Sequence, residues 1–196
     1  MPFAFYDRLA PRRRRIYDRS DAIVELPLPP GDPLDPVVAS IRLGLERDRT
    51  AETRRACQAL IDALCERFEV PSIRVKVYPT RPSGDWGELH GMYRPGEDGQ
   101  PTVVEVWMRT AQQQKVVAPR TFLRTLLHEF CHHLDYEHFG LEETFHTEGF
   151  YKRESHLLTQ LAGPSARRPP AQDSGPESRP GATDTGTRSA SAQSSS

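Results

Sequence analysis

Five of the seven histidines of the chain lie in the stretch LLHEFCHHLDYEHFGLEETFHTEGF, residues 126–150. Within it, His128, Glu129 and His132 form the pattern HExxH. On a helix, positions four apart lie on the same face, so the two imidazoles can reach one ion. Neutral imidazole is a good zinc ligand, and Glu129 lies beside such an ion without having to bind it. The pattern predicts a zinc site in which Glu129, as general base, takes a proton from a zinc-bound water that attacks a peptide carbonyl.

A catalytic zinc site has three protein ligands and one open position, so a third ligand must come from elsewhere. His138 has the spacing of the HExxHxxGxxH pattern, but Asp135 stands where that pattern has glycine. His146 follows His132 by fourteen residues, which is enough for a loop to return to the site. Glu154 would complete a set of two histidines and a glutamate. The residues alone leave these three candidates open.

Hydrophobic periodicity predicts the elements that position these residues. Apolar side chains at helical spacing indicate helices, and alternating apolar and polar side chains between Gly- and Pro-rich turns indicate strands. In chain order, the predicted elements are helices 37–45 and 51–68, strands 72–78, 87–95 and 101–110, and helices 121–136 and 148–161. We therefore expect an α+β domain with an N-terminal helix, a small three-stranded sheet, the HExxH helix and a closing helix.

Composition divides the chain into three parts. Residues 1–35 read as an extended, loop-like segment that ends in LPLPPGDPLDP, and residues 36–162 carry the periodic pattern. From residue 163 to residue 196 the chain has no aromatic residue and no Leu, Ile, Val or Met. Such a segment buries too little apolar surface to offset its ordering entropy, so we expect a disordered tail rich in Pro, Ser and Gly.

Charge and hydropathy narrow the range of partners and compartments. The formal net charge is −1, which gives no support for a nucleic-acid or membrane partner. The basic run Arg12 to Arg15 is short, and we expect it to be solvated or paired with acids. No stretch approaches eighteen apolar residues, and the N-terminus lacks the apolar run of a secretory signal, so we expect a soluble, cytoplasmic protein. The three cysteines form no CxxC pair and are expected to be reduced, buried thiols.

The segment HEFCHHLDYEHFG, followed by HTEGFY, resembles the SprT-like metalloprotease domain, a family that includes bacterial SprT proteins and the DNA–protein crosslink protease Spartan. In that family a loop of about a dozen residues follows the HExxH helix, and a histidine in an HGxxF/W motif then opens the next helix and supplies the third ligand. The positions of this chain that match are His128, Glu129, His132, His146 and Phe150. The resemblance covers about residues 37–162. Two departures are the insertion of Thr147 and Glu148 before Gly149, and the absence of the CxxC pairs of a zinc ribbon.

The resemblance implies a minimal zincin fold and a zinc metalloendopeptidase that hydrolyses protein or peptide substrates. Its implied zinc ligands are His128, His132 and His146, and its catalytic residue is Glu129. Two alternatives belong to other classes. One is a non-catalytic zinc-stabilised binding module, in which His138 supplies a fourth donor. The other is a DNA-recruited protein that acts on DNA-bound proteins, with nucleic-acid contacts from residues 12–15 and from Arg54 and Arg55.

Other residues are assigned supporting roles. Zincins commonly bind substrate as an extra strand along a sheet edge, and VVEVWMR, residues 103–109, is the candidate edge strand. The alternative for the same residues is an internal, structural strand. The developing oxyanion needs a donor, for which the candidates in range are Tyr136, Tyr151 and Arg153. The second ring N–H of a ligand histidine needs an acceptor, for which the candidates are Asp135 and Glu143. We expect His133 and His156 to lie outside the ligand set.

Overall fold

The computed structural model describes residues 6–85, 87–97 and 99–163, and it confirms a mixed α+β protein with a small three-stranded sheet. The described helices are η1 (Tyr6–Arg8), α1 (Pro11–Ala22), α2 (Asp35–Glu46), α3 (Thr50–Phe68), α4 (Pro119–Glu137) and α5 (Glu148–Ala162). The described strands are β1 (Arg74–Thr80), β2 (Ser83–Gly84), β3 (Gly87–Glu88), β4 (Gly91–Arg94) and β5 (Val103–Arg109). The predicted disordered tail, residues 163–196, lies outside the described residues apart from Gly163.

The sheet has the order β1-β5-β4, so β5 is the central strand. β1 runs parallel to β5, with Val75 opposite Val104, and β4 runs antiparallel to β5, with Tyr93 opposite Val104. β2 and β3 form a separate two-stranded ribbon. Of the two alternatives for residues 103–109, the edge strand is wrong and the internal strand is confirmed, and the edge strand that packs beside α4 is β4.

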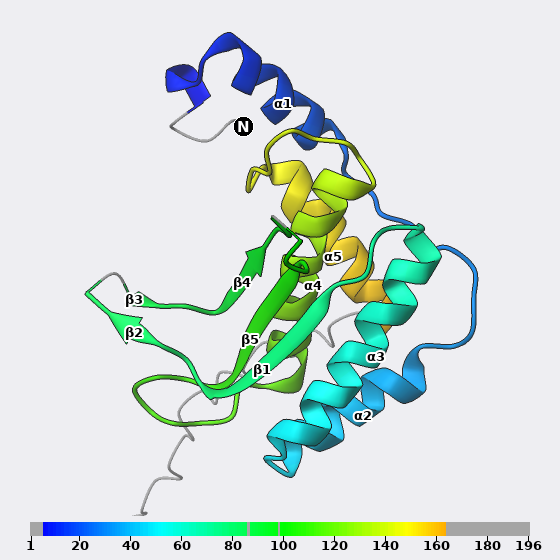
Figure 1. Cartoon of the computed structure of the whole chain (residues 1–196), viewed down its shortest axis with the longest axis vertical. Helices are drawn as coiled ribbons and strands as arrows, with labels where there is room; N and C mark the ends of the chain where they lie inside the picture. The colour runs from blue at the N-terminus through cyan, green and yellow to red at the C-terminus, as the bar shows by residue number, and fades with distance from the viewer. Residues whose placement is uncertain (1–5, 86, 98, 164–196) are drawn as a thin grey trace, which may run out of the picture. The chain divides into compact units, whose positions relative to one another are not determined.

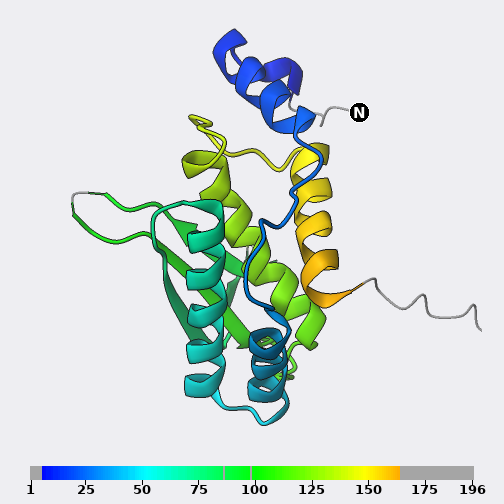
Figure 2. The ribbon, with the colours of Figure 1, turned by 90° about the vertical axis from the view of Figure 1, so that its right-hand side faces the viewer.

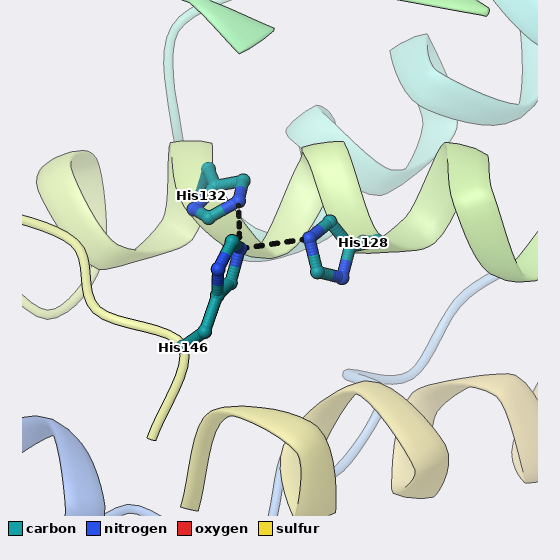
Figure 3. Close-up of side chains that lie close together, drawn as sticks. All are labelled: His128, His132 and His146. Carbon is teal, nitrogen blue, oxygen red and sulfur yellow. Dashed lines mark hydrogen bonds between the residues drawn. The ribbon is translucent and has the colours of Figure 1, made fainter. Parts of the chain in front are cut away.

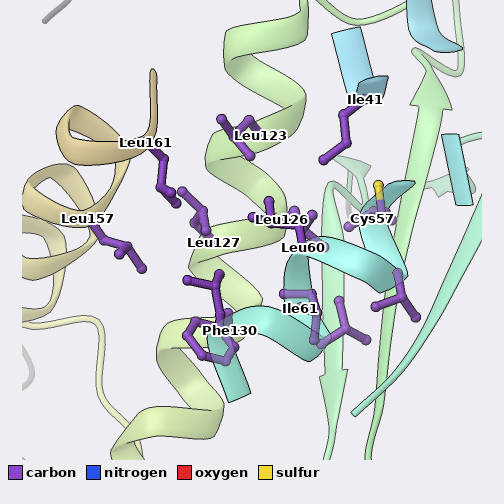
Figure 4. Close-up of a cluster of buried hydrophobic side chains, with 14 of the residues drawn as sticks. Ile41, Cys57, Leu60, Ile61, Leu123, Leu126, Leu127, Phe130, Leu157 and Leu161 are labelled. Atoms are coloured by element: carbon purple, nitrogen blue, oxygen red, sulfur yellow. The ribbon is translucent and has the colours of Figure 1, made fainter. Parts of the chain in front are cut away.

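The helices cover one face of the sheet in two layers. α3 packs on β1, and α4 packs on β4 and β5, while α5 packs on α4 from the side away from the sheet (Figures 1 and 2). Figure 4 shows Leu157 and Leu161 of α5 pointing toward Leu127 of α4, with Leu60 and Ile61 of α3 on the other side. In this main core α4 lies between α5 on one side and the sheet with α3 on the other. The HExxH motif therefore sits on a helix that is packed along most of its length.

The N-terminal segment differs from its prediction. Residues 1–35 were expected to be loop-like, but Pro11–Ala22 form α1, which packs against α5. Ile16 and Tyr17 of α1 pack with Leu141 and Phe145 in a second hydrophobic cluster, separate from the main core. The helix was missed because its few buried side chains contact a loop more than 120 residues away, which local periodicity cannot reveal.

Candidate metal centre

Three histidines, two from α4 and one from the loop before α5, converge on one point. His128 and His132 lie one turn apart on α4, and His146 lies in the loop that leads into α5 (Figure 3). Nε2 of His146 lies 3.0 Å from Nε2 of His128 and 3.0 Å from Nε2 of His132. Among the described residues, the group of side chains that could hold a metal ion consists of these three histidines.

The hydrogen-bond partners of Nδ1 in His128 and in His132 determine which nitrogen of each ring carries the proton. Nδ1 of His128 lies 2.8 Å from Oε2 of Glu154, and a carboxylate accepts, so this Nδ1 carries the proton. Nδ1 of His132 lies 2.7 Å from Oγ1 of Thr144, whose own proton goes to Asp135. The hydroxyl therefore accepts from His132. In both histidines Nε2 is left with a lone pair that points to the convergence point.

This proton distribution fits a cation at the convergence point. The Nε2 atoms of His128 and His132 are both acceptors. A proton on Nε2 of His146 could be donated to one of them but not to both. For a tetrahedral zinc ion with Zn–N distances of about 2.0–2.1 Å, nitrogen ligands lie roughly 3.3 Å apart. Two of the three separations, those from His146, are 3.0 Å and close to that value, and all three ligand atoms lie within 4.8 Å of one another. The cluster could hold a metal ion.

Burial favours the neutral form of two of the three imidazoles. Burial, aided by the neighbouring histidines, lowers the pKa of His132 to about 2, and burial also lowers the pKa of His146. Neutral imidazole is the form that binds metal. His132 is almost fully buried, whereas His146 is exposed, so one side of the cluster opens to solvent. A ligand from solution can reach the convergence point from that side.

The Glu129 carboxyl lies beside this cluster in an enclosed position. Its side chain is only 6% exposed, and burial raises its pKa to about 7, against the lowering effects of His128 and of a hydrogen bond from the Tyr93 backbone. It lies against Gly91 of β4, where a β-carbon would be 2.3 Å from Oε1. The edge strand therefore holds Glu129 in place. A carboxyl group with a pKa near neutrality can both accept and return a proton.

The other two candidates for the third ligand lie elsewhere. His138 is the C-cap residue of α4, and its ring packs at 5.5 Å from the ring of Phe68, outside the cluster. Glu154 is 4% exposed and lies behind His128, where its second oxygen is 3.3 Å from Nε of Arg124. Glu154 thus orients a ligand through its Nδ1 side. Such outer partners fix the tautomer and the direction of a metal-binding imidazole.

The predicted acceptors of ring N–H groups were only partly right. Asp135 reaches His132 through Thr144, and Glu143 instead pairs at the surface with Arg13 at 2.7 Å. The direct acceptors are Thr144 and Glu154. Thr144 was missed because a lone hydroxyl in a loop carries no sequence signal, although its position two residues before His146 places it near the site.

The three candidates for an oxyanion donor occupy different environments. Arg153 is fully buried and forms an ion pair with Asp135, so its guanidinium faces away from the open side. Tyr136 stacks on the ring of Tyr93 at 6.0 Å. Tyr151 is 44% exposed and stacks on His146 at 5.9 Å, which makes its phenol the one that borders the cluster on the open side.

The histidines expected outside the ligand set have structural partners. His133 is fully buried, with Nε2 donating to the Pro71 carbonyl at 2.9 Å and Nδ1 accepting from the Tyr93 hydroxyl at 3.1 Å. Burial lowers the pKa of His133, in agreement with a neutral ring. Nδ1 of His156 accepts a hydrogen bond from the Leu26 backbone. Both rings therefore join segments that are distant in sequence.

The basic run of α1 is engaged in contacts within the chain. Arg12 pairs with Glu142, Arg13 pairs with Glu143, and the Arg14 guanidinium lies over the Tyr6 ring. This agrees with the expectation of acid-paired arginines. The three cysteines are free and buried, as expected.

No helix among the described residues is both long and apolar enough to span a bilayer.

Comparisons with protein-family models, with curated proteins and with solved structures find no match for this chain.

Proposed function

We propose that the chain is a zinc-dependent endopeptidase of the SprT-like, minimal zincin type. The observation that carries the proposal is the convergence of three Nε2 atoms, from His128, His132 and His146, beside a carboxyl group that does not belong to the ligand group. Three nitrogen ligands with one open position are typical of catalytic zinc, whereas structural zinc sites are closed by four protein ligands. The location of His138 outside the cluster favours catalysis over a closed binding module.

Zinc is the ion proposed because three neutral imidazoles and no thiolate suit it well. When bound, zinc supplies a Lewis acid that polarises a peptide carbonyl and makes water more acidic. The buried partners Glu154 and Thr144 hold two of the imidazoles in the tautomer that such binding needs. The exposed side of His146 leaves room for a peptide to approach.

Glu129 has the role of general base and then general acid. It accepts a proton from the attacking water and returns it to the leaving nitrogen as the peptide bond breaks. Its enclosure by Gly91 and the Tyr93 backbone keeps the carboxyl in one orientation for both transfers. Substrates are proteins or peptides, since the chemistry acts on the backbone.

The test is metal content and cleavage measured on the same preparations. Wild type is expected to contain about one zinc per chain by elemental analysis and to cleave an unfolded protein such as casein. His146→Ala is expected to lose both zinc and cleavage. Glu129→Gln is expected to retain zinc and lose cleavage, because the amide cannot accept the proton. Cleavage by Glu129→Gln at the wild-type rate, or wild type without zinc after reconstitution, would contradict the proposal.

A further inference from the structure

A fully buried arginine connects the N-terminal helix α1 to the cluster of three histidines. Arg153 projects from α5, and its side chain is 0% exposed. Nη1 donates to the carbonyls of Ser20 and Ile23 at the end of α1, and Nη2 donates to Oγ of Ser20. The same Nη2 donates to Asp135 of α4 at 2.6 Å. One guanidinium thus ties three helices together.

Both oxygens of the carboxylate that accepts from Arg153 have a partner. Asp135 is 0% exposed, with Oδ1 bound to Arg153 and Oδ2 accepting from Oγ1 of Thr144 at 2.7 Å. Burying a charge without a partner is very unfavourable, so each member of this ion pair depends on the other. The pair fixes the position and the orientation of the Thr144 hydroxyl.

That hydroxyl in turn determines the state of His132. Thr144 has one proton, and because it goes to Asp135, the oxygen must accept from Nδ1 of His132 at 2.7 Å. Nε2 of His132 is therefore kept free of a proton and directed at the convergence point. If the hydrogen bonds from His132 to Thr144 and from Thr144 to Asp135 were lost, the His132 ring could rotate or change tautomer.

The end of α1 also fixes the loop that carries His146. Oδ1 of Asp21 accepts a hydrogen bond from the Gly149 N–H at the start of α5, and Oγ of Ser20 lies 3.4 Å from Oγ1 of Thr147. A β-carbon on Gly149 would lie within van der Waals overlap of the Asp21 carbonyl, at 2.2 Å. The close approach of α1 therefore needs glycine at position 149. Both His132 and His146 are thus linked to α1.

We propose that Arg153 is a positioning residue that makes metal affinity depend on α1, acting through Asp135 and Thr144 on His132. The proposal rests on the proposed metal site and adds a determinant that lies outside the ligand set. It assigns the N-terminal helix a part in the site, in place of the loop-like segment expected from the sequence.

The first test changes the link next to the ligand. Thr144→Val keeps the size of the side chain and removes the hydroxyl, and Thr144→Ser keeps the hydroxyl. Zinc affinity is measured by competition with a chromophoric chelator, and folding by circular dichroism. Thr144→Val is expected to lower affinity about 10–100-fold, as loss of an outer partner does, and Thr144→Ser is expected to remain near wild type.

A matched control separates positioning from general stability. Thr53 of α3 is buried and its hydroxyl donates to the Arg49 carbonyl, away from the cluster. Thr53→Val makes the same substitution at a buried hydroxyl and is expected to leave zinc affinity unchanged. Equal losses in the two Val variants would overturn the proposal.

The second test links α1 to the ligand. Ser20→Ala removes one acceptor of Arg153 and is expected to lower zinc affinity several-fold. If Ser20 acts through Thr144, the double variant with Thr144→Val loses no more than Thr144→Val alone. Multiplied losses would overturn the connection. Wild-type affinity in Thr144→Val, with one zinc bound to the wild-type protein, would overturn the positioning role and leave the proposed function intact, whereas a zinc-free wild type would remove both.

Discussion

Gly91 and Glu129 are in contact across the boundary between β4 and α4. A β-carbon on Gly91 would lie 2.3 Å from Oε1 of Glu129 and 2.8 Å from Cγ2 of Thr125. Because both neighbours sit on a helix held in the main core, α4 cannot retreat from the strand. The position of the proposed base is therefore set by the absence of a side chain at position 91.

Gly91→Ala is expected to reduce peptide cleavage and to leave zinc content near one per chain. The added methyl group displaces the carboxyl without touching a ligand, and a misplacement of about 1 Å costs roughly 100-fold in rate. Cleavage kinetics and elemental analysis measure the two effects. Gly31→Ala is the control, since the atoms nearest to its β-carbon would belong to the side chain of Arg67. A variant that cleaves at the wild-type rate would show that Glu129 is not held by Gly91.

Glu129→Gln is expected to stabilise the metal-free protein at pH 8. Burial raises the pKa of Glu129 from 4.5 to about 7, so above pH 7 the folded protein holds a buried charge that the unfolded chain exposes to water. The shift corresponds to at most about 3 kcal/mol. Below pH 4.5 the group is neutral in both states, and the advantage of Gln should vanish. Urea unfolding with a chelator present, at pH 4.5 and pH 8, measures the difference. A wild type as stable as the variant at pH 8 contradicts the expectation.

Three substitutions rank the candidates for the third ligand. His146→Ala is expected to abolish tight zinc binding, because it removes a ligand atom from the cluster. Glu154→Ala is expected to weaken binding about 10–100-fold, because its carboxylate holds Nδ1 of His128. His138→Ala is expected to have no effect. Chelator competition measures all three, and a larger loss in Glu154→Ala than in His146→Ala would reverse the assignment.

The three thiols are expected to be unreactive in the folded protein. Burial raises the pKa of Cys65 to about 11 and raises those of Cys57 and Cys131 as well, so little thiolate exists at pH 8. Ellman's reagent should find almost no thiol in the native state and three per chain after unfolding. Rapid native labelling of even one cysteine would show that a part of the main core is open.

The elements with strong local patterns could be predicted from the sequence. The helix around the HExxH pattern, the long helix before β1 and the strands around Val75 and Val104 follow from apolar periodicity, which burial in the main core imposes directly. The pair His128 and His132 follows from helix geometry alone. Their convergence with His146 depends on the path of a loop, and the sequence offered three candidates for that position.

The sequence could not reveal features that depend on pairing between distant residues. Whether residues 103–109 form an edge or an internal strand could not be decided, because strand order is a tertiary property, and β1 and β4 pair with β5 on either side. Arg153 was a candidate oxyanion donor because it is in range of the site by sequence. Its burial becomes favourable only through Asp135 and Ser20, which lie 18 and 133 residues away.

The separation of the second hydrophobic cluster from the main core has a consequence for exchange of the metal. His128 and His132 sit on a helix of the main core, whereas His146 follows directly after Phe145 of the smaller cluster. Small clusters open in sub-global fluctuations at lower free energy than global unfolding. Amide protons of residues 138–147 should therefore exchange with deuterium sooner than those of α3 and α4. Release of a bound ion would then follow the opening rate of this smaller unit, with most of the molecule still folded.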